Sequence, residues 1–157
     1  MGTSTKIFGA ALGLSLLAGA ALGASDEDMA VQAAIKARQA QMDLYAYNLG
    51  ILGAMAKGDV EYNADIAGGA ASNIVTLTSL DQSTLWPEGS DSMAAETRAL
   101  PAIWDNFPDV MTKSQALVEA AVAMEAAAGT GIDGLRAAIG PLGGACGACH
   151  KVYRAPE

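Results

Sequence analysis

Apolar residues recur at three- and four-residue intervals in four segments of this chain, and this spacing restricts the fold more than any other feature. The segments are 31–56, 66–80, 103–124 and 132–153. Side chains three and four positions apart share one face of a helix, whereas a half-buried strand requires strict alternation. Residues 82–101, which contain Pro, Gly, Ser and Asp clusters, form the longest connection. The pattern predicts an all-α fold, an antiparallel four-helix bundle with one long crossover.

Glycines and prolines mark the ends of the expected helices. Gly58 should stop the first helix. Pro108 must lie in the first turn of the third helix, which Asp105 or Asn106 would then cap. Pro141 falls inside the fourth segment, where its ring would press on a backbone carbonyl one turn earlier. We therefore expect the fourth helix to kink or to restart there.

The first residues have the pattern of an export signal. Lys6 precedes an apolar, glycine-rich run that ends in small residues at Gly23 and Ala24. Small residues at this point suit signal-peptidase cleavage, while the glycines disfavour the alternative of a retained membrane anchor. We therefore expect residues 1–24 to be a signal peptide, residues 25–157 to form a single domain, and the protein to be periplasmic.

The charge of the chain is strongly negative. The formal net charge is −8, and removal of Lys6 with the signal peptide makes it −9. Nucleic acids and anionic membrane surfaces both require a basic footprint, so neither is an expected partner. A redox partner protein with a basic docking patch would be compatible with this charge, although solubility alone would explain it equally well.

All the cysteines and the single histidine of the chain lie within five positions, at Cys146, Cys149 and His150. On a helix the two thiols share a face, so they can add to the two vinyl groups of one haem while the imidazole reaches the iron. A zinc site would need a fourth ligand, a thioredoxin-like pair would need a preceding strand, and a disulfide would leave His150 unexplained. The sequence predicts one covalent haem c.

With His150 as fifth ligand, the sixth iron ligand is a methionine or the position is open, because there is no second histidine. Met42 lies on the apolar stripe of the first helix, one turn after Arg38. An arginine on such a stripe suggests a buried anion, and a haem propionate would supply one. The alternatives are that Arg38 extends to the rim of the bundle and that Met42 simply fills the core.

Four segments together resemble the cytochrome c′ family, the class II c-type cytochromes. They are KARQAQM at 36–42, PAIW at 101–104, LRAAIG at 135–140 and CGACHKVYR at 146–154. The resemblance implies a left-handed antiparallel bundle with the haem inside, often dimeric through its first two helices. Pro141 and the long crossover depart from the family pattern.

The resemblance also implies a role for each site residue. By this resemblance, Cys146 and Cys149 form the thioethers, His150 is the proximal iron ligand, Arg154 lines the proximal pocket, Arg38 lies on the propionate side and Met42 faces the distal side of the iron. A methionine at the distal position ligates iron in low-spin members of the family and only shields it in others. The alternative explanation of Arg154 is that its own positive charge interacts favourably with the C-terminal end of its helix.

These features favour an electron carrier whose haem iron changes oxidation state. The alternative is a protein that binds or buffers NO or CO at an open sixth coordination site. A third possibility, from a different functional class, is a structural helical bundle that carries no haem. No acid–base pair or second metal constellation accompanies the motif, so we do not expect an enzyme.

Overall fold

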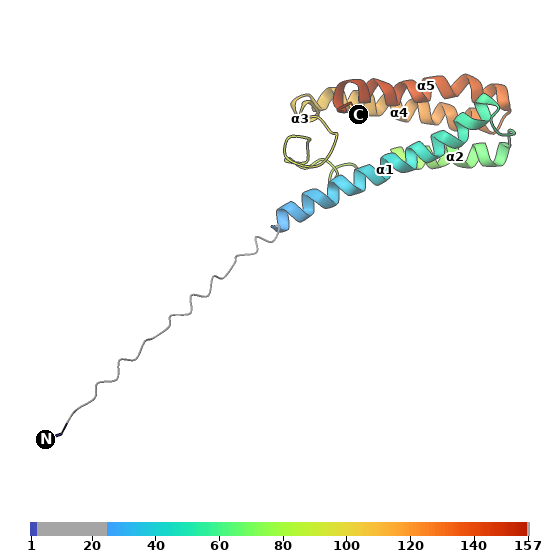
Figure 1. Cartoon of the computed structure of the whole chain (residues 1–157). Helices are drawn as coiled ribbons and strands as arrows, with labels where there is room; N and C mark the ends of the chain where they lie inside the picture. The colour runs from blue at the N-terminus through green and yellow to red at the C-terminus, as the bar shows by residue number, and fades with distance from the viewer. Residues whose placement is uncertain (3–24, 157) are drawn as a thin grey trace.

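The computed structural model describes residues 1–2 and 25–156, so the predicted signal peptide lies almost wholly outside the described residues. Its helices are α1 (Asp26–Lys57), α2 (Ala64–Thr78), α3 (Ala102–Asp105), α4 (Phe107–Ala128) and α5 (Ile132–Tyr153). The four long helices run side by side, and the crossover between α2 and α4 lies at one end of them (Figure 1). Helix α4 packs against α2 and α5, and α1 packs against α2 and α5. This arrangement confirms the predicted antiparallel four-helix bundle.

Helix α1 begins with a complete capping box. The Ser25 side chain accepts a hydrogen bond from the amide of Asp28 at 3.1 Å, and the Asp28 carboxylate accepts one from the amide of Ser25 at 3.1 Å. Acidic side chains in the first turn also interact favourably with the helix dipole. The helix ends at Gly58, whose φ of 84° is left-handed backbone that glycine adopts without strain. The predicted stop at Gly58 is confirmed.

The third predicted helix is divided in the structure. Asn106 occupies the cap position of α4 and Pro108 lies in its first turn, as expected, but Ile103 belongs to the separate short helix α3. Asn106 leaves the helical region, with φ −138° and ψ 51°. A continuous helix would force the ring of Pro108 against the carbonyl of Trp104 one turn earlier, which explains the interruption.

Helix α5 continues through Pro141 without a break, so the predicted restart is wrong. Both Pro141 and Ala137, whose carbonyl loses its helical donor, lie on the exposed side of the helix. Water can therefore hydrate the freed carbonyl, and the core-facing side of α5 remains regular.

The core contains residues from all four long helices. Its most completely buried large side chains include Leu52, Ile74, Met124, Leu135 and Leu142. Leu142 lies one turn before Cys146 on α5, so the face that packs into the core leads directly to the two cysteines. Packing of this face thus fixes the direction in which the cysteine-containing segment points.

Among the described residues, no helix has both the length and the apolar character needed to cross a bilayer.

Candidate haem-binding site

Helix α5 directs both cysteines into the bundle. Cys146 and Cys149 are half-buried and are not joined by a disulfide. Cys146 is close enough to Tyr45 of α1 to interact with it electrostatically, and Cys149 interacts in the same way with Lys113 of α4. Burial raises the pKa of both thiols. The two thiols therefore lie on the side of α5 that faces α1 and α4.

His150 lies on the same turn as Cys149 and is half-buried. Burial lowers its pKa, and the positive charges of Arg154 and Arg98 lower it further. At neutral pH the imidazole is consequently neutral, which is the form that coordinates a metal.

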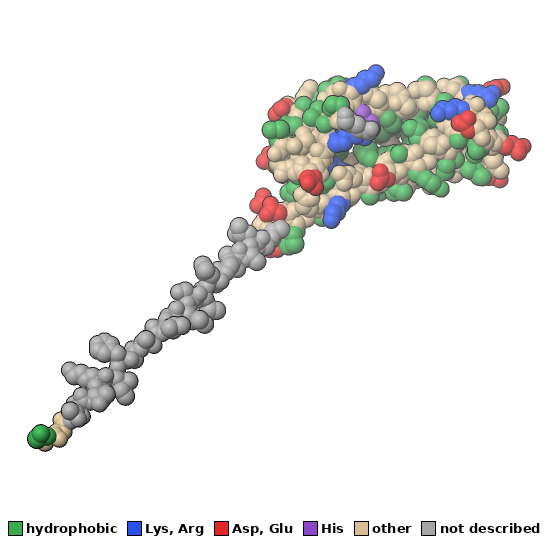
Figure 2. Space-filling model, viewed as in Figure 1, with side chains coloured by type: hydrophobic (Ala, Val, Ile, Leu, Met, Phe, Trp, Pro, Cys, Tyr) green, Lys and Arg blue, Asp and Glu red, His purple; other side chains and the backbone are tan. Residues whose placement is uncertain are grey.

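Small residues surround the cysteines on α5. Beyond the local helix backbone, no atom lies within 4 Å of the position that a Cβ would take at Gly143, Gly144 or Gly147. Figure 2 shows the surface hollowed between the α5 and α1 sides of the bundle, with basic side chains at its edge. The two thiols share one face of the helix, a neutral imidazole lies beside them, and the residues around them are small. This arrangement fits a flat, covalently attached haem.

The residues described do not form an alternative metal centre. Nowhere in residues 25–156 do three or more His, Cys, Asp or Glu side chains gather so that they could hold a metal ion.

Across the bundle, a stripe of α1 faces the cysteine-containing part of α5. It includes Arg38, Met42 and Tyr45, which follow one another at helical spacing. Arg38 is only 3% exposed, whereas Met42 is 39% exposed and so does not belong to the packed core. Burial and the neighbouring Cys146 thiol raise the pKa of Tyr45 to about 12. Sequence analysis did not select Tyr45, although its place on the apolar stripe was a signal.

Arg38 binds the crossover rather than solvent. Its guanidinium donates to the hydroxyl of Ser90 at 2.7 Å, to the carbonyl of Ser90, to the carbonyl of Leu85 at 3.2 Å and to the hydroxyl of Thr97 at 3.3 Å. A guanidinium with these partners is not extended to the rim of the bundle, so that alternative is wrong. Its predicted role beside a haem propionate stays a prediction.

Two tryptophans complete the surroundings of Arg38. The guanidinium carbon lies 4.8 Å from the ring centre of Trp86 and 5.9 Å from that of Trp104. The two rings meet edge to face, and the indole N–H of Trp104 donates to the carbonyl of Trp86 at 3.1 Å. Ring faces attract a cation most strongly where water is excluded. Nothing in the local sequence around Arg38 indicated these partners.

The end of α5 is held by a polar cluster on α4. The Tyr153 hydroxyl donates to Asp109 Oδ2 at 2.6 Å, and Lys113 Nζ lies 3.0 Å from Oδ1 and 2.9 Å from Oδ2 of the same carboxylate. Both hydrogen bonds lower the pKa of Asp109, and the bond between Tyr153 and Asp109 raises the pKa of Tyr153 to about 12. The spacing of Asp109 and Lys113, one turn apart, was the only signal in the sequence.

Arg154 lies directly after α5, with an exposed side chain and a backbone paired to the crossover. It forms a single antiparallel bridge with Ala99. On either side of this bridge, Leu100 N–H donates to the Tyr153 carbonyl at 3.0 Å and Ala155 N–H donates to the Arg98 carbonyl at 2.8 Å. Residues 98–100 and 153–155 are thus joined next to His150.

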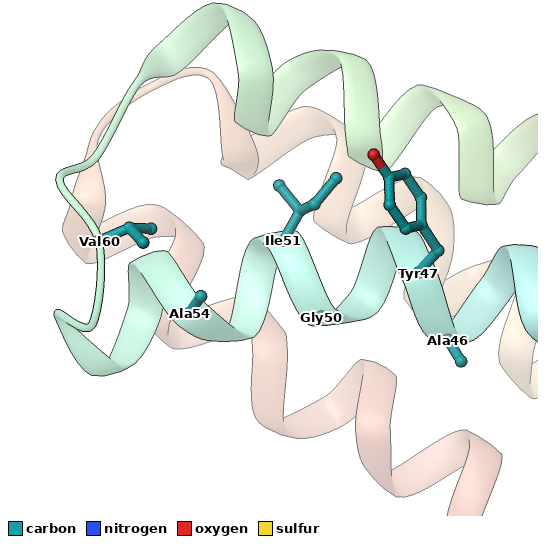
Figure 3. Close-up of a pocket in the computed structure, with 6 residues that line it drawn as sticks. All are labelled: Ala46, Tyr47, Gly50, Ile51, Ala54 and Val60. Carbon is teal, nitrogen blue, oxygen red and sulfur yellow. The ribbon is translucent and has the colours of Figure 1, made fainter.

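A shallow apolar surface lies on α1 and the connection that follows it. This surface, called here the α1 patch, is lined by Ala46, Tyr47, Gly50, Ile51, Ala54 and Val60. Figure 3 shows Tyr47, Ile51 and Ala54 following one another along the helix, with Val60 on the connection to α2. Tyr47 is 68% exposed and Val60 is 50% exposed. The patch is an apolar surface open to a partner.

Comparison with known proteins places these features in one family. Residues 33–154 match the sequence profile described as Cytochrome C′. A cytochrome c-554 from Cereibacter sphaeroides is 43% identical over 145 residues, covering 92% of this chain and 94% of that protein. The solved cytochrome c′ from Rhodobacter Spheriodes has a TM-score of 0.79 and 38% identity, covering 81% of this chain and 98% of that one. A ferrous variant of the Alcaligenes xylosoxidans protein with bound NO has a TM-score of 0.71 and 30% identity, covering 81% and 97%.

Proposed function

Because the chain belongs to the cytochrome c′ family and carries the one covalent c-type haem of that family, we propose that it is a periplasmic electron-transfer protein. The observation that carries the proposal is the inward face of α5, which brings two thiols and a neutral imidazole together opposite α1. The iron of such a haem supplies one-electron chemistry, whose potential depends on its axial ligands and on burial.

Each site residue has a proposed task. Cys146 and Cys149 bind the haem through thioethers, and His150 is the proximal iron ligand. Arg154 lies next to His150 at the end of α5 and adds positive charge there, as its effect on the pKa of His150 indicates. Arg38 fixes the crossover at the other side of the site. These side chains bind, orient and partly shield the iron, and we propose no enzymatic activity.

Met42 is the proposed sixth ligand. It lies between Arg38 and Tyr45 on the α1 stripe, and Tyr45 is within electrostatic reach of Cys146. The 39% exposure of Met42 means that core packing does not hold its thioether. Methionine beside histidine raises the potential of a haem and suits an electron carrier.

The alternative function is binding or buffering of NO or CO at an open sixth coordination site. It is favoured by one specific observation, the similar solved cytochrome c′ with bound NO. In that case Met42 would only shield the iron, and the apolar side chains of the α1 stripe would admit small neutral ligands.

Visible spectra of the purified holoprotein test the two functions. Methionine ligation predicts a low-spin spectrum with a sulfur-to-iron charge-transfer band in the oxidised state, and Met42→Leu should convert it to high-spin. An open site predicts a high-spin spectrum that shifts under CO and that Met42→Leu leaves high-spin. Met111→Leu, at a 53% exposed position of α4, is the matched control and should change neither. Absence of covalent haem absorption would overturn both functions.

The partners follow from the surface. With 17 acidic and 9 basic side chains, the chain suits a redox partner that has a basic docking patch. The α1 patch suits a second copy of the chain, consistent with the dimers that the family resemblance implies. Placing a charge there by Tyr47→Glu should turn dimers into monomers in sedimentation velocity, and a wild-type monomer would contradict this assembly.

Residues 1–24 are the proposed export signal, which N-terminal sequencing of the periplasmic protein would test.

A further inference from the structure

The crossover between α2 and α4 is attached to the rest of the protein at two places, and these lie on the two sides of the haem site. One attachment is Arg38 of α1, one turn before Met42. The other is the backbone pairing of residues 98–100 with residues 153–155, directly after His150. Segments that are distant in the sequence are therefore joined through one loop.

The attachment at Arg38 is specific. Ser90 is completely buried, and its hydroxyl accepts from Arg38 while donating to the Pro87 carbonyl at 2.6 Å. Thr97, which also accepts from Arg38, is followed directly by the residues that pair with the end of α5. A planar guanidinium presents five donors in a rigid fork and stacks flat on aromatic rings, whereas a lysine ammonium is a compact point charge with three donors. Loss of this group would release both Ser90 and Thr97.

The attachment at the end of α5 is a short stretch of paired backbone. Arg98 adds to it, because its side chain donates to the Ala155 carbonyl from Nε at 2.8 Å and from Nη2 at 2.6 Å. Ala155 N–H in turn donates to the Arg98 carbonyl. Such an isolated pairing has few hydrogen bonds of its own, so its stability depends on how firmly the crossover is held elsewhere.

We infer that Arg38 is a positioning residue for the proximal side of the haem, acting through the crossover on the end of α5 that contains His150 and Arg154. This inference rests on the proposed function. It gives Arg38 a task different from direct binding of a propionate, since the guanidinium already donates to three crossover residues and lies against Trp86 and Trp104. A change at Arg38 on one side of the site should thus be felt at His150 on the other side.

Amide hydrogen exchange of the haem-loaded mature protein tests the link. The probes are the amides of Leu100 and Ala155, whose acceptors are the carbonyls of Tyr153 and Arg98. Arg38→Leu should speed exchange at both amides by about tenfold or more, and the milder Ser90→Ala should speed it less. Arg38→Lys should resemble Arg38→Leu because it lacks the planar fork. Lys36→Gln, at an exposed position of the same helix, is the matched control and should have no effect.

A second measurement separates positioning from simple loop stability. The reduction potential of the haem should shift in Arg38→Leu and also in Ser90→Ala, because Ser90 lies in the crossover and can act on the proximal side only through it. If exchange at Leu100 and Ala155 is unchanged in both variants, the link is refuted, and a change of potential confined to the Arg38 variants would then assign Arg38 to a propionate. If exchange rises while the potential stays fixed, Arg38 only holds the loop and the inference is overturned. Covalent haem in the wild-type protein, measured by mass, reports the proposed function separately.

Discussion

The hydroxyl of Tyr153 donates a 2.6 Å hydrogen bond to Oδ2 of Asp109 and so fastens the last turn of α5 to the first turn of α4. Lys113 holds the same carboxylate from the next turn of α4. His150 lies one turn before Tyr153, so its backbone is fixed by a bonded and buried neighbour. The haem helix is therefore anchored on both sides of the proximal ligand, by the core at Leu142 and by this cluster at its end.

Removal of the Tyr153 hydroxyl should destabilise the protein. Tyr153→Phe keeps the buried ring but leaves the Asp109 carboxylate without its short hydrogen bond, so the midpoint of urea unfolding should fall. Tyr47→Phe, at a position that is 68% exposed, is the control and should leave the midpoint unchanged. Equal midpoints for Tyr153→Phe and the wild type would show that the hydrogen bond contributes nothing to stability.

The same hydrogen bond predicts a loss of stability in alkali. The bond to Asp109, with burial as a second cause, raises the pKa of Tyr153 to about 12, while an unfolded tyrosine titrates near 10. Because the folded pKa is the higher one, the stabilisation is fully present below about pH 10 and is lost as the pH rises towards about 12. Urea unfolding at a series of alkaline pH values should show this decline. Tyr153→Phe should weaken it, and an identical slope in that variant would rule out Tyr153 as a source.

The core directly before the cysteines is predicted to be sensitive to cavities. Leu142 is 1% exposed, so Leu142→Ala should lower the free energy of unfolding by about 2–5 kcal/mol. Val122→Ala, at a 50% exposed position of α4, should change it by no more than about 0.5 kcal/mol. Urea titration monitored by far-ultraviolet circular dichroism measures both changes. A small change in the free energy of unfolding for Leu142→Ala would mean that neighbouring side chains move to fill the cavity.

Helical spacing was sufficient to predict the four long helices, because one buried face per helix is all that a bundle requires. The stop at Gly58 and the cap at Asn106 followed from local backbone chemistry. By contrast, the continuity of α5 at Pro141 depends on which side of the helix meets water, and a single sequence does not state this.

The site was only partly predictable for a related reason. Cys146, Cys149 and His150 are close in sequence, so their shared chemistry is visible as a motif. The hydrogen-bond partners of Arg38 lie between 47 and 59 residues away along the chain, and the fold alone brings them together. An arginine on an apolar stripe indicated a buried partner without indicating which one.

The capping box of α1 is the next test. Ser25→Ala removes both the acceptor for the Asp28 amide and the 2.8 Å hydrogen bond from the serine hydroxyl to the Asp28 carboxylate. Loss of such a cap should lower stability by about 1 kcal/mol, measured by urea unfolding of the mature chain. Ser25→Asn should retain most of the stability because its side chain can also accept at a helix start. A Ser25→Ala variant as stable as the wild type would show that the cap is unimportant.

The last prediction concerns the two cysteines, which face different helices and should each hold the haem independently. Cys146 neighbours Tyr45 of α1, and Cys149 neighbours Lys113 and Asp109 of α4. Cys146→Ala and Cys149→Ala should each keep one thioether, so the haem should stay with the polypeptide after denaturation and acid–acetone extraction. The double variant should lose it and appear in mass spectrometry as the bare chain.

His150→Ala is the matched comparison for these cysteine variants. It retains both thiols, so its mass should still include the haem, while its visible spectrum should change because the proximal ligand is gone. The thioethers form at the two sulfur atoms and the iron bond forms at the imidazole, so attachment and ligation should be affected separately in these variants. Haem retained by the double cysteine variant after denaturation, or an unaltered spectrum in His150→Ala, would refute the assignment of these residues.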